Sequence, residues 1–144
     1  MKTPSRLLAL VAFTLATLPA WAAPVWLTDL DEAKKVAIKE NKPILVDFTG
    51  SDWCPHCRTL EDNVLASEAF QSWADGRVIL LMVDLPQHGI SQAVRSERSQ
   101  VCIKYGVRTF PSGLLIGPDG QKLAIQTGYA GAAPETWIAH FDSH

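Results

Sequence analysis

The fold is decided by the stretch PILVDFTGSDWCPHC, residues 43–57. Its first half, Pro43–Thr49, is a short apolar run with β-branched residues, which is typical of a strand buried on both faces. The Gly-Ser-Asp that follows predicts a turn. Pro55 fits the first turn of a helix, where its missing N–H is not needed. The two cysteines therefore lie where a buried strand passes into a helix.

Strands and helices alternate along the rest of the chain. Hydrophobic patterns predict strands at residues 25–27, 77–85, 113–116 and 122–127, and helices at residues 30–41, 55–73, 91–105 and 134–141. The residues Gly117-Pro118-Asp119-Gly120 are typical of a hairpin turn between the last two strands. The order β-α-β-α-β-α-β-β-α predicts an α/β fold, with a mixed sheet that is parallel in its first part and has helices on both faces.

Length and composition exclude several classes of protein. The 144 residues suffice for one ordinary domain, and a content of 47% hydrophobic and 19% charged residues is not that of a disordered chain. The 13 basic and 15 acidic residues leave no surplus of positive charge to bind a nucleic acid. Three cysteines are too few for a disulfide-stapled miniprotein or for a zinc site of four cysteines.

The N-terminus has the pattern of a cleaved secretory signal, Met1–Ala22. Two basic residues precede an apolar stretch at residues 7–18, and Ala20-Trp21-Ala22 supplies the small residues that signal peptidase requires. Cleavage after Ala22 would leave residues 23–144 as one domain.

The alternative is an uncleaved membrane anchor, because residues 7–27 carry no charge and are long enough to span a bilayer. Pro19 and Pro24 interrupt that stretch, which favours the signal. Removal of Lys2 and Arg6 leaves 11 of the 13 basic residues against 15 acidic residues, a net charge of −4. A short signal of this kind is typical of bacteria, so we expect a periplasmic domain, in a compartment where disulfides persist.

The two cysteines of the Cys-x-x-Cys motif indicate redox chemistry, because the thiolate is the nucleophile in thiol–disulfide exchange. At a helix N-terminus, Cys54 would lie beside unpaired N–H groups, which favour the ionised sulfur. A free thiol is only about 3% ionised at pH 7, whereas thiols in such motifs are roughly half to fully ionised. Two other interpretations remain, a static structural disulfide and half of a zinc site.

The chain resembles the thioredoxin superfamily over nearly all of its mature length. Four segments carry the likeness: the strand with an internal acid at residues 44–48, the redox motif at residues 53–57, the approach to a cis-proline at residues 105–111, and a final hairpin with Asp119-Gly120-Gln121 and Gly128-Tyr129. More narrowly, the motif Gly-Ser-Asp-Trp-Cys-Pro-His-Cys, with Val83-Asp84-Leu85-Pro86, is similar to a subgroup of exported bacterial thioredoxin-like proteins. The resemblance implies one thioredoxin-like domain of three layers over residues 23–144.

The resemblance also implies roles for the residues of the motif. Cys54 would be the attacking thiol and Cys57 the resolving thiol. Asp47 would lie beneath Cys57 and move its proton, because a buried carboxyl group has a raised pKa. The alternative for Asp47 is a strand-end residue that faces solvent. Pro55 and His56 would tune the redox potential.

Three further residues would face the substrate. Pro111 would be a cis-proline that packs against the disulfide and presents the backbone of Phe110 to an extended substrate segment. Trp53 would shield the motif and line the partner surface, the alternative being a core aromatic residue. Cys102, by contrast, is expected to pack as a small apolar residue.

Two features indicate opposite directions of electron flow. The Pro-His pair is also found in periplasmic oxidants of the DsbA type, and His56 would stabilise the Cys54 thiolate and so make the disulfide more oxidising. Asp47, by contrast, is typical of thioredoxin-like reductases. Residues 23–144 also leave no space for the helical insertion that the oxidants carry.

We therefore expect a periplasmic thiol–disulfide oxidoreductase that reduces protein disulfides and exchanges electrons with a membrane thiol donor or acceptor. Its partners would be protein thiols and disulfides, and it would act as a monomer with no metal, organic cofactor or nucleic acid. Oxidation is the close alternative, and isomerisation is less favoured because a dimerisation region does not fit. A different class also stays open, a non-catalytic binding module that uses the surface around Trp53 and Phe110.

Overall fold

The computed structural model of the protein describes residues 23–144, and within them the strands form one mixed sheet in the order β1-β3-β2-β4-β5. The parallel part consists of β1 (Trp26–Leu27), β3 (Ile79–Asp84) and β2 (Ile44–Thr49). The antiparallel part adds β4 (Ser112–Ile116), next to β2, and the edge strand β5 (Lys122–Thr127). The predicted α/β fold with a mixed sheet is thus confirmed.

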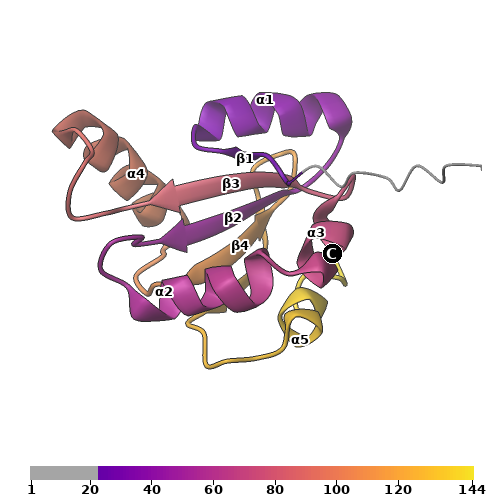
Figure 1. Ribbon diagram of the computed structural model, residues 1–144. Helices are drawn as coiled ribbons and strands as arrows, with labels where there is room; N and C mark the ends of the chain where they lie inside the picture. Colours follow the sequence, from indigo (N-terminus) through magenta and orange to yellow (C-terminus); the bar gives the residue numbers. More distant parts are fainter. Residues whose placement is uncertain (1–22) are drawn as a thin grey trace, which may run out of the picture.

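Helices cover both faces of this sheet (Figure 1). One face carries α1 (Leu30–Glu40) and α4 (Gln92–Tyr105). The opposite face carries α2 (Pro55–Leu60), α3 (Glu68–Ala74) and α5 (Pro134–Ala139). A separate hydrophobic core lies between the sheet and each helical layer.

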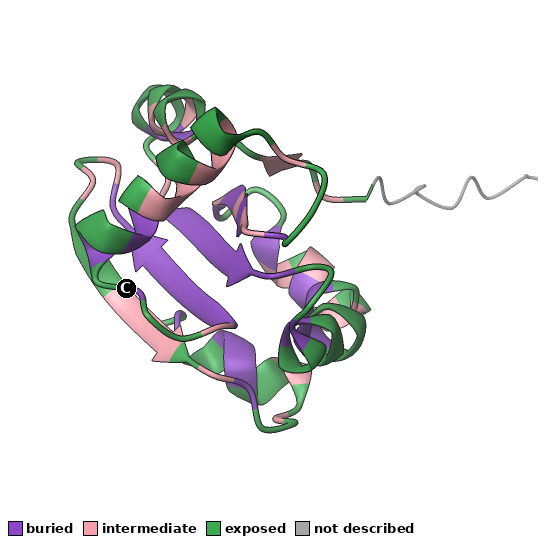
Figure 2. Ribbon diagram, turned by 90° about the vertical axis from the view of Figure 1, so that its left-hand side faces the viewer, coloured by how far each residue is buried: buried purple, intermediate pink, exposed green. Residues whose placement is uncertain are grey.

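The central strand β2 divides its side chains between the two cores. All six of its residues are buried, as the sequence predicts, and Figure 2 shows the middle of the sheet as buried. Val46 and Phe48 belong to the core under α1 and α4, whereas Leu45 belongs to the core on the α2 side. Because side chains alternate along a strand, Asp47 points to the same side as Leu45. A carboxyl group therefore lies on the face that α2 covers.

The single helix predicted for residues 55–73 is wrong. The structure has α2, then a π-helical turn η1 (Glu61–Leu65), a break at Ser67, and α3. The backbone of Ser67 is extended (φ −72°, ψ 149°), and its hydroxyl accepts a hydrogen bond from the Phe70 N–H at 3.2 Å. At about 100° per residue, Leu65 and Phe70 would lie about 140° apart on one continuous helix. The break lets both side chains enter the same core.

Two other expectations concern the rest of the chain. Cys102 is a free thiol in the core under α1 and α4, which confirms that it packs as an apolar residue. The expected signal, Met1–Ala22, lies outside the described residues. Among residues 23–144, no helix is long and apolar enough to cross a membrane.

Candidate active site

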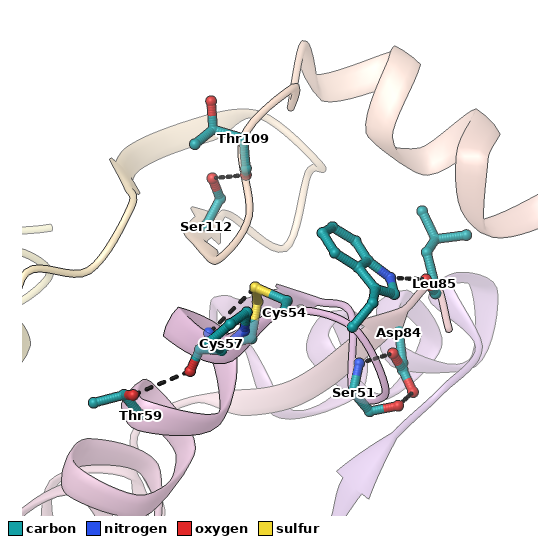
Figure 3. Close-up of a disulfide and its surroundings, with 10 residues drawn as sticks. Ser51, Cys54, Cys57, Thr59, Asp84, Leu85, Thr109 and Ser112 are labelled. Carbon is teal, nitrogen blue, oxygen red and sulfur yellow. Dashed lines mark hydrogen bonds between the residues drawn. A yellow bond between two sulfur atoms is a disulfide. The ribbon is translucent and has the colours of Figure 1, made fainter. Parts of the chain in front are cut away.

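The two cysteines of the motif form a disulfide at the start of α2. Cys54 is the N-cap residue of the helix, Pro55 is its first residue, and Cys57 lies three residues after Cys54. Their Cα atoms are 5.3 Å apart, and the Cys57 N–H donates a hydrogen bond to the Cys54 sulfur at 3.3 Å (Figure 3). In the opened dithiol, the same N–H would stabilise negative charge on Cys54.

The sulfurs are shielded from bulk solvent. Only 4% of Cys54 and 3% of Cys57 is exposed. The residues around them, Pro55, His56 and Arg58, are exposed. A partner must therefore fit closely around the motif before its own sulfur reaches the disulfide.

The loop before β4 lies beside the disulfide (Figure 3). The Phe110–Pro111 peptide bond is cis, as the resemblance implies. The Ser112 hydroxyl donates to the carbonyl of Thr109 at 2.6 Å, which closes the loop. Because Ser112 pairs with Phe48 of β2, β4 begins where β2 ends, and this pairing brings the cis-proline loop to the cysteines.

Trp53 is a surface residue that is held in place by polar and aromatic contacts. It is 40% exposed, so the interpretation as a core aromatic residue is wrong. Its indole N–H donates to the carbonyl of Leu85 at 2.8 Å. Its ring meets Phe110 edge-on, with ring centroids 5.7 Å apart. Together the two rings form a partly exposed apolar surface next to the motif.

Asp47 is buried on the α2 side of the sheet. It is 4% exposed, so the interpretation as a solvent-facing residue is wrong, and its Oδ1 atom has no hydrogen-bond partner. Burial, and then the charges of Glu61 and Asp84, raise the pKa of Asp47 from 3.8 to about 7. A carboxyl group with this pKa can take up or release a proton near neutral pH.

Glu61, which follows α2 directly, was not among the site residues predicted from the sequence. Burial, and then the charge of Asp62, raise the pKa of Glu61, and Glu61 in turn raises the pKa of Asp47. Glu61 comes four residues after Cys57, so the helical period places both on one side of the helix. That spacing was the signal available in the sequence.

Comparison with known proteins adds to this geometry. Residues 30–142 match the thioredoxin-like domain family. The chain belongs to this thioredoxin-like family. It is 32% identical over 109 residues to the disulfide bond reductase DsbH of Chlamydia pneumoniae, covering 75% of this chain and 66% of that relative. It is 25% identical over 100 residues to the thioredoxin-related protein DsbJ of the same organism, covering 69% of this chain but 29% of the relative. The chain thus spans just under two thirds of one curated relative and less than a third of the other.

Solved structures agree with the family. A structure of a DsbH oxidoreductase has a TM-score of 0.78 and 28% identity, covering 92% of each chain. A thioredoxin from Thermus thermophilus has a TM-score of 0.65 and 14% identity, covering 85% of this chain and 87% of that one, and it shows the fold alone.

The thioredoxin-like fold brings most of the expected site residues to one end of the sheet. The disulfide at the start of α2 and the cis-Pro111 loop lie side by side, and Asp47 is buried on the face that α2 covers. His56 lies between the cysteines, with its side chain exposed. A disulfide at the start of a helix in a thioredoxin-like domain is an arrangement suited to thiol–disulfide exchange.

Proposed function

We propose that this chain reduces disulfide bonds in periplasmic proteins, with Cys54 as the attacking thiol and Cys57 as the resolving thiol. The observation that supports reduction, as opposed to oxidation, is the buried acid of the site, Asp47. Its pKa is raised by burial and by the charges of Glu61 and Asp84. The name of one relative, a disulfide bond reductase, supports the same direction.

In this mechanism, the reduced motif transfers two electrons to the substrate. The Cys54 thiolate attacks one sulfur of the substrate disulfide, and the released substrate thiolate takes a proton from water. Cys57 then gives its proton to the Asp47 carboxylate, and its thiolate attacks the Cys54 sulfur. The second substrate thiolate leaves and is protonated by water, while Asp47 returns its proton to solvent. One disulfide is reduced and one is formed.

The carboxyl groups favour reduction for an electrostatic reason. The disulfide is neutral, whereas the opened motif carries the negative charge of a thiolate. Negative charges at Asp47, Glu61 and Asp84 disfavour that thiolate. They therefore raise the free energy of the reduced form and make it a stronger reductant.

His56 acts in the opposite sense, because a histidine beside Cys54 favours the thiolate. Its side chain is exposed, so solvent and salt weaken this electrostatic effect. Asp47 is buried, and the charges that act on a buried group are screened much less. We therefore expect the carboxyl groups to affect the reduction potential more strongly than His56 does.

The reduction potential of the Cys54–Cys57 couple tests the direction. It is measured by equilibrating the protein with redox buffers of dithiothreitol or glutathione. We expect about −270 mV, the value of thioredoxin. A value of about −120 mV, as in DsbA, would overturn reduction and establish oxidation.

Substitution of Cys54 distinguishes an enzyme from a binding module. Cys54→Ser should abolish insulin reduction. Cys102→Ala is the matched control, because that thiol lies in the core on the other face of the sheet, and it should retain activity. If a Cys54→Ser strain keeps the function of the chain in the cell, the non-catalytic binding module replaces our proposal.

The proposed location rests on the signal pattern of Met1–Ala22. We expect a monomer in the periplasm that starts at Ala23 and receives electrons from a membrane thiol donor. Mass spectrometry of the protein from separated cell fractions tests the cleavage. An intact N-terminus in the membrane fraction would establish the anchor instead.

A further inference from the structure

The motif Gly-Ser-Asp-Trp before the cysteines has no part in the exchange chemistry described above, but the structure joins it to a second loop. Ser51 donates two hydrogen bonds to the Asp84 carboxylate at the end of β3. Its backbone N–H lies 2.9 Å from one oxygen, and its hydroxyl lies 2.7 Å from the other (Figure 3). The active-site loop is thus tied to the neighbouring parallel strand.

The same two loops are also joined in the reverse sense. The Asp52 carboxylate accepts hydrogen bonds from the backbone N–H groups of Gln87 at 2.8 Å and His88 at 3.1 Å. The Trp53 indole donates to the carbonyl of Leu85 at 2.8 Å. Each side supplies one carboxylate that accepts two hydrogen bonds from the other. We call the hydrogen bonds between residues 51–53 and residues 84–88 the loop clamp.

Other contacts keep both halves of the loop clamp in place. Arg98 donates to the carbonyl of Asp84 at 2.6 Å, and Arg95 to the carbonyl of Gln87 at 3.3 Å. At Gly50, any Cβ atom would overlap the indole of Trp53. The loop clamp therefore joins two sequence motifs that lie far apart along the chain, Gly-Ser-Asp-Trp and Asp-Leu-Pro.

We propose that the loop clamp holds Trp53 as a fixed wall of the substrate surface and so makes the chain selective for protein disulfides over small disulfides. This inference rests on the proposed function. The Trp53 ring contacts Phe110, the residue before cis-Pro111. A protein segment that reaches the shielded sulfurs must pack against these rings, and a prearranged surface lowers the entropic cost of binding. A small disulfide makes few contacts there and gains little from the wall.

A charge-preserving variant tests this proposal, because the charge of Asp84, which the loop clamp holds, also raises the pKa of Asp47. Ser51→Ala/Asp52→Glu removes the hydroxyl donor and moves the carboxylate away from its two N–H partners, while every charge is kept. The matched control is Ser72→Ala/Asp75→Glu. It makes the same two changes at exposed positions near the end of α3, whose side chains make no hydrogen bonds among the described residues.

Each protein is reduced, freed of reductant and mixed with insulin or with the small disulfide DTNB in single-turnover experiments. We expect the second-order rate constant for insulin to fall about tenfold, which corresponds to about 1.4 kcal/mol. The rate constant for DTNB and the reduction potential should equal those of the control. This selective loss would not arise from general loosening of the fold.

Three outcomes would overturn the proposal. They are an equal loss with insulin and DTNB, a changed reduction potential, or an unchanged insulin rate. If circular dichroism shows that the double variant does not fold, Ser51→Ala is compared with Ser72→Ala by the same criteria, with an expected loss of about threefold. If the wild type reduces no insulin, the proposed function fails by itself. The loop clamp is then tested by the rates at which the disulfide form oxidises a reduced protein and a small thiol.

Discussion

Replacement of Asp47 by asparagine should change how the stability of the oxidised protein depends on pH. As the pH rises from 4 to 8, the free energy of unfolding of Asp47→Asn should increase relative to that of wild type. The Asp47 side chain is buried, its Oδ1 atom has no partner, and its pKa is about 7. In the unfolded chain the same group ionises near its ordinary pKa of 3.8. Above pH 3.8, folding must therefore either return a proton to this group or bury its charge, and both cost free energy. Asparagine has nearly the same size and cannot ionise.

The magnitude follows from the two pKa values. Below pH 3.8, Asp47 is protonated in both states and carries no penalty. Between pH 3.8 and about 7, only the folded state keeps the proton, so the free energy of unfolding falls by about 1.4 kcal/mol per pH unit. Above that range both states are ionised, and the loss levels off at about 4 kcal/mol. The buried amide of asparagine costs about 1 to 3 kcal/mol at every pH, so it cancels when two pH values are compared.

Urea unfolding of the oxidised proteins at pH 4 and pH 8 measures this difference. The gain of Asp47→Asn over wild type should be about 4 kcal/mol larger at pH 8. Asp75→Asn, at an exposed position after α3, is the control and should show almost no pH-dependent gain. If Asp47→Asn gains the same amount at both pH values, the pKa of Asp47 is not raised in the folded state, and the observation that supports reduction is refuted.

Three other predictions follow from the same site and its core. Glu61→Gln should lower the pKa of Asp47, because it removes a negative charge that raises it, and an NMR titration of the Asp47 carboxyl carbon that shows no change would contradict this. The rate of insulin reduction by wild type should rise as the pH passes about 7, because only ionised Asp47 accepts the proton of Cys57. In Asp47→Asn this step should be absent and the rate at pH 8 lower by on the order of a hundredfold, whereas matching pH profiles would remove Asp47 from the mechanism. Gly113→Ala should destabilise the protein by about 1 to 3 kcal/mol, because its Cβ would lie 2.8 Å from Trp137 Cζ2 and 3.0 Å from Phe141 Cζ. Urea unfolding should show a smaller cost in a Phe141→Leu background, and an equal cost in both would mean that this contact is not the cause.

Local patterns were sufficient to predict the order of the strands and of all the helices except those at residues 55–73. The apolar run at Pro43–Thr49 predicts a strand without knowledge of its neighbours in space, because a strand buried on both faces needs apolar side chains in succession. The helix after Pro55 was predicted to start correctly but to run too far. Its end depends on whether Leu65 and Phe70 reach one core, and that core includes residues from distant strands and from α5. Only the complete packing decides this.

The candidate site divides in a similar way. Cys54 and Cys57 could be found from the sequence, because their spacing and the proline between them are local features of one helical turn. The cis peptide bond before Pro111 was expected from the resemblance alone. Glu61 was missed, because its four-residue spacing from Cys57 does not by itself reveal that its charge acts on Asp47. The pKa of Asp47 depends on that neighbour and on Asp84.

By itself, the sequence determined that this chain carries a Cys-x-x-Cys motif between a buried strand and a helix, in an α/β order of elements. These properties arise from neighbours along the chain, whose spacing is set by the periods of helix and strand. Only the tertiary structure decided which carboxyl groups act on the buried acid, and that Ser51 and Asp52 bind a loop more than thirty residues away. The parallel pairing of β2 with β3 brings the ends of the two strands together, and this neighbourhood in space creates the loop clamp.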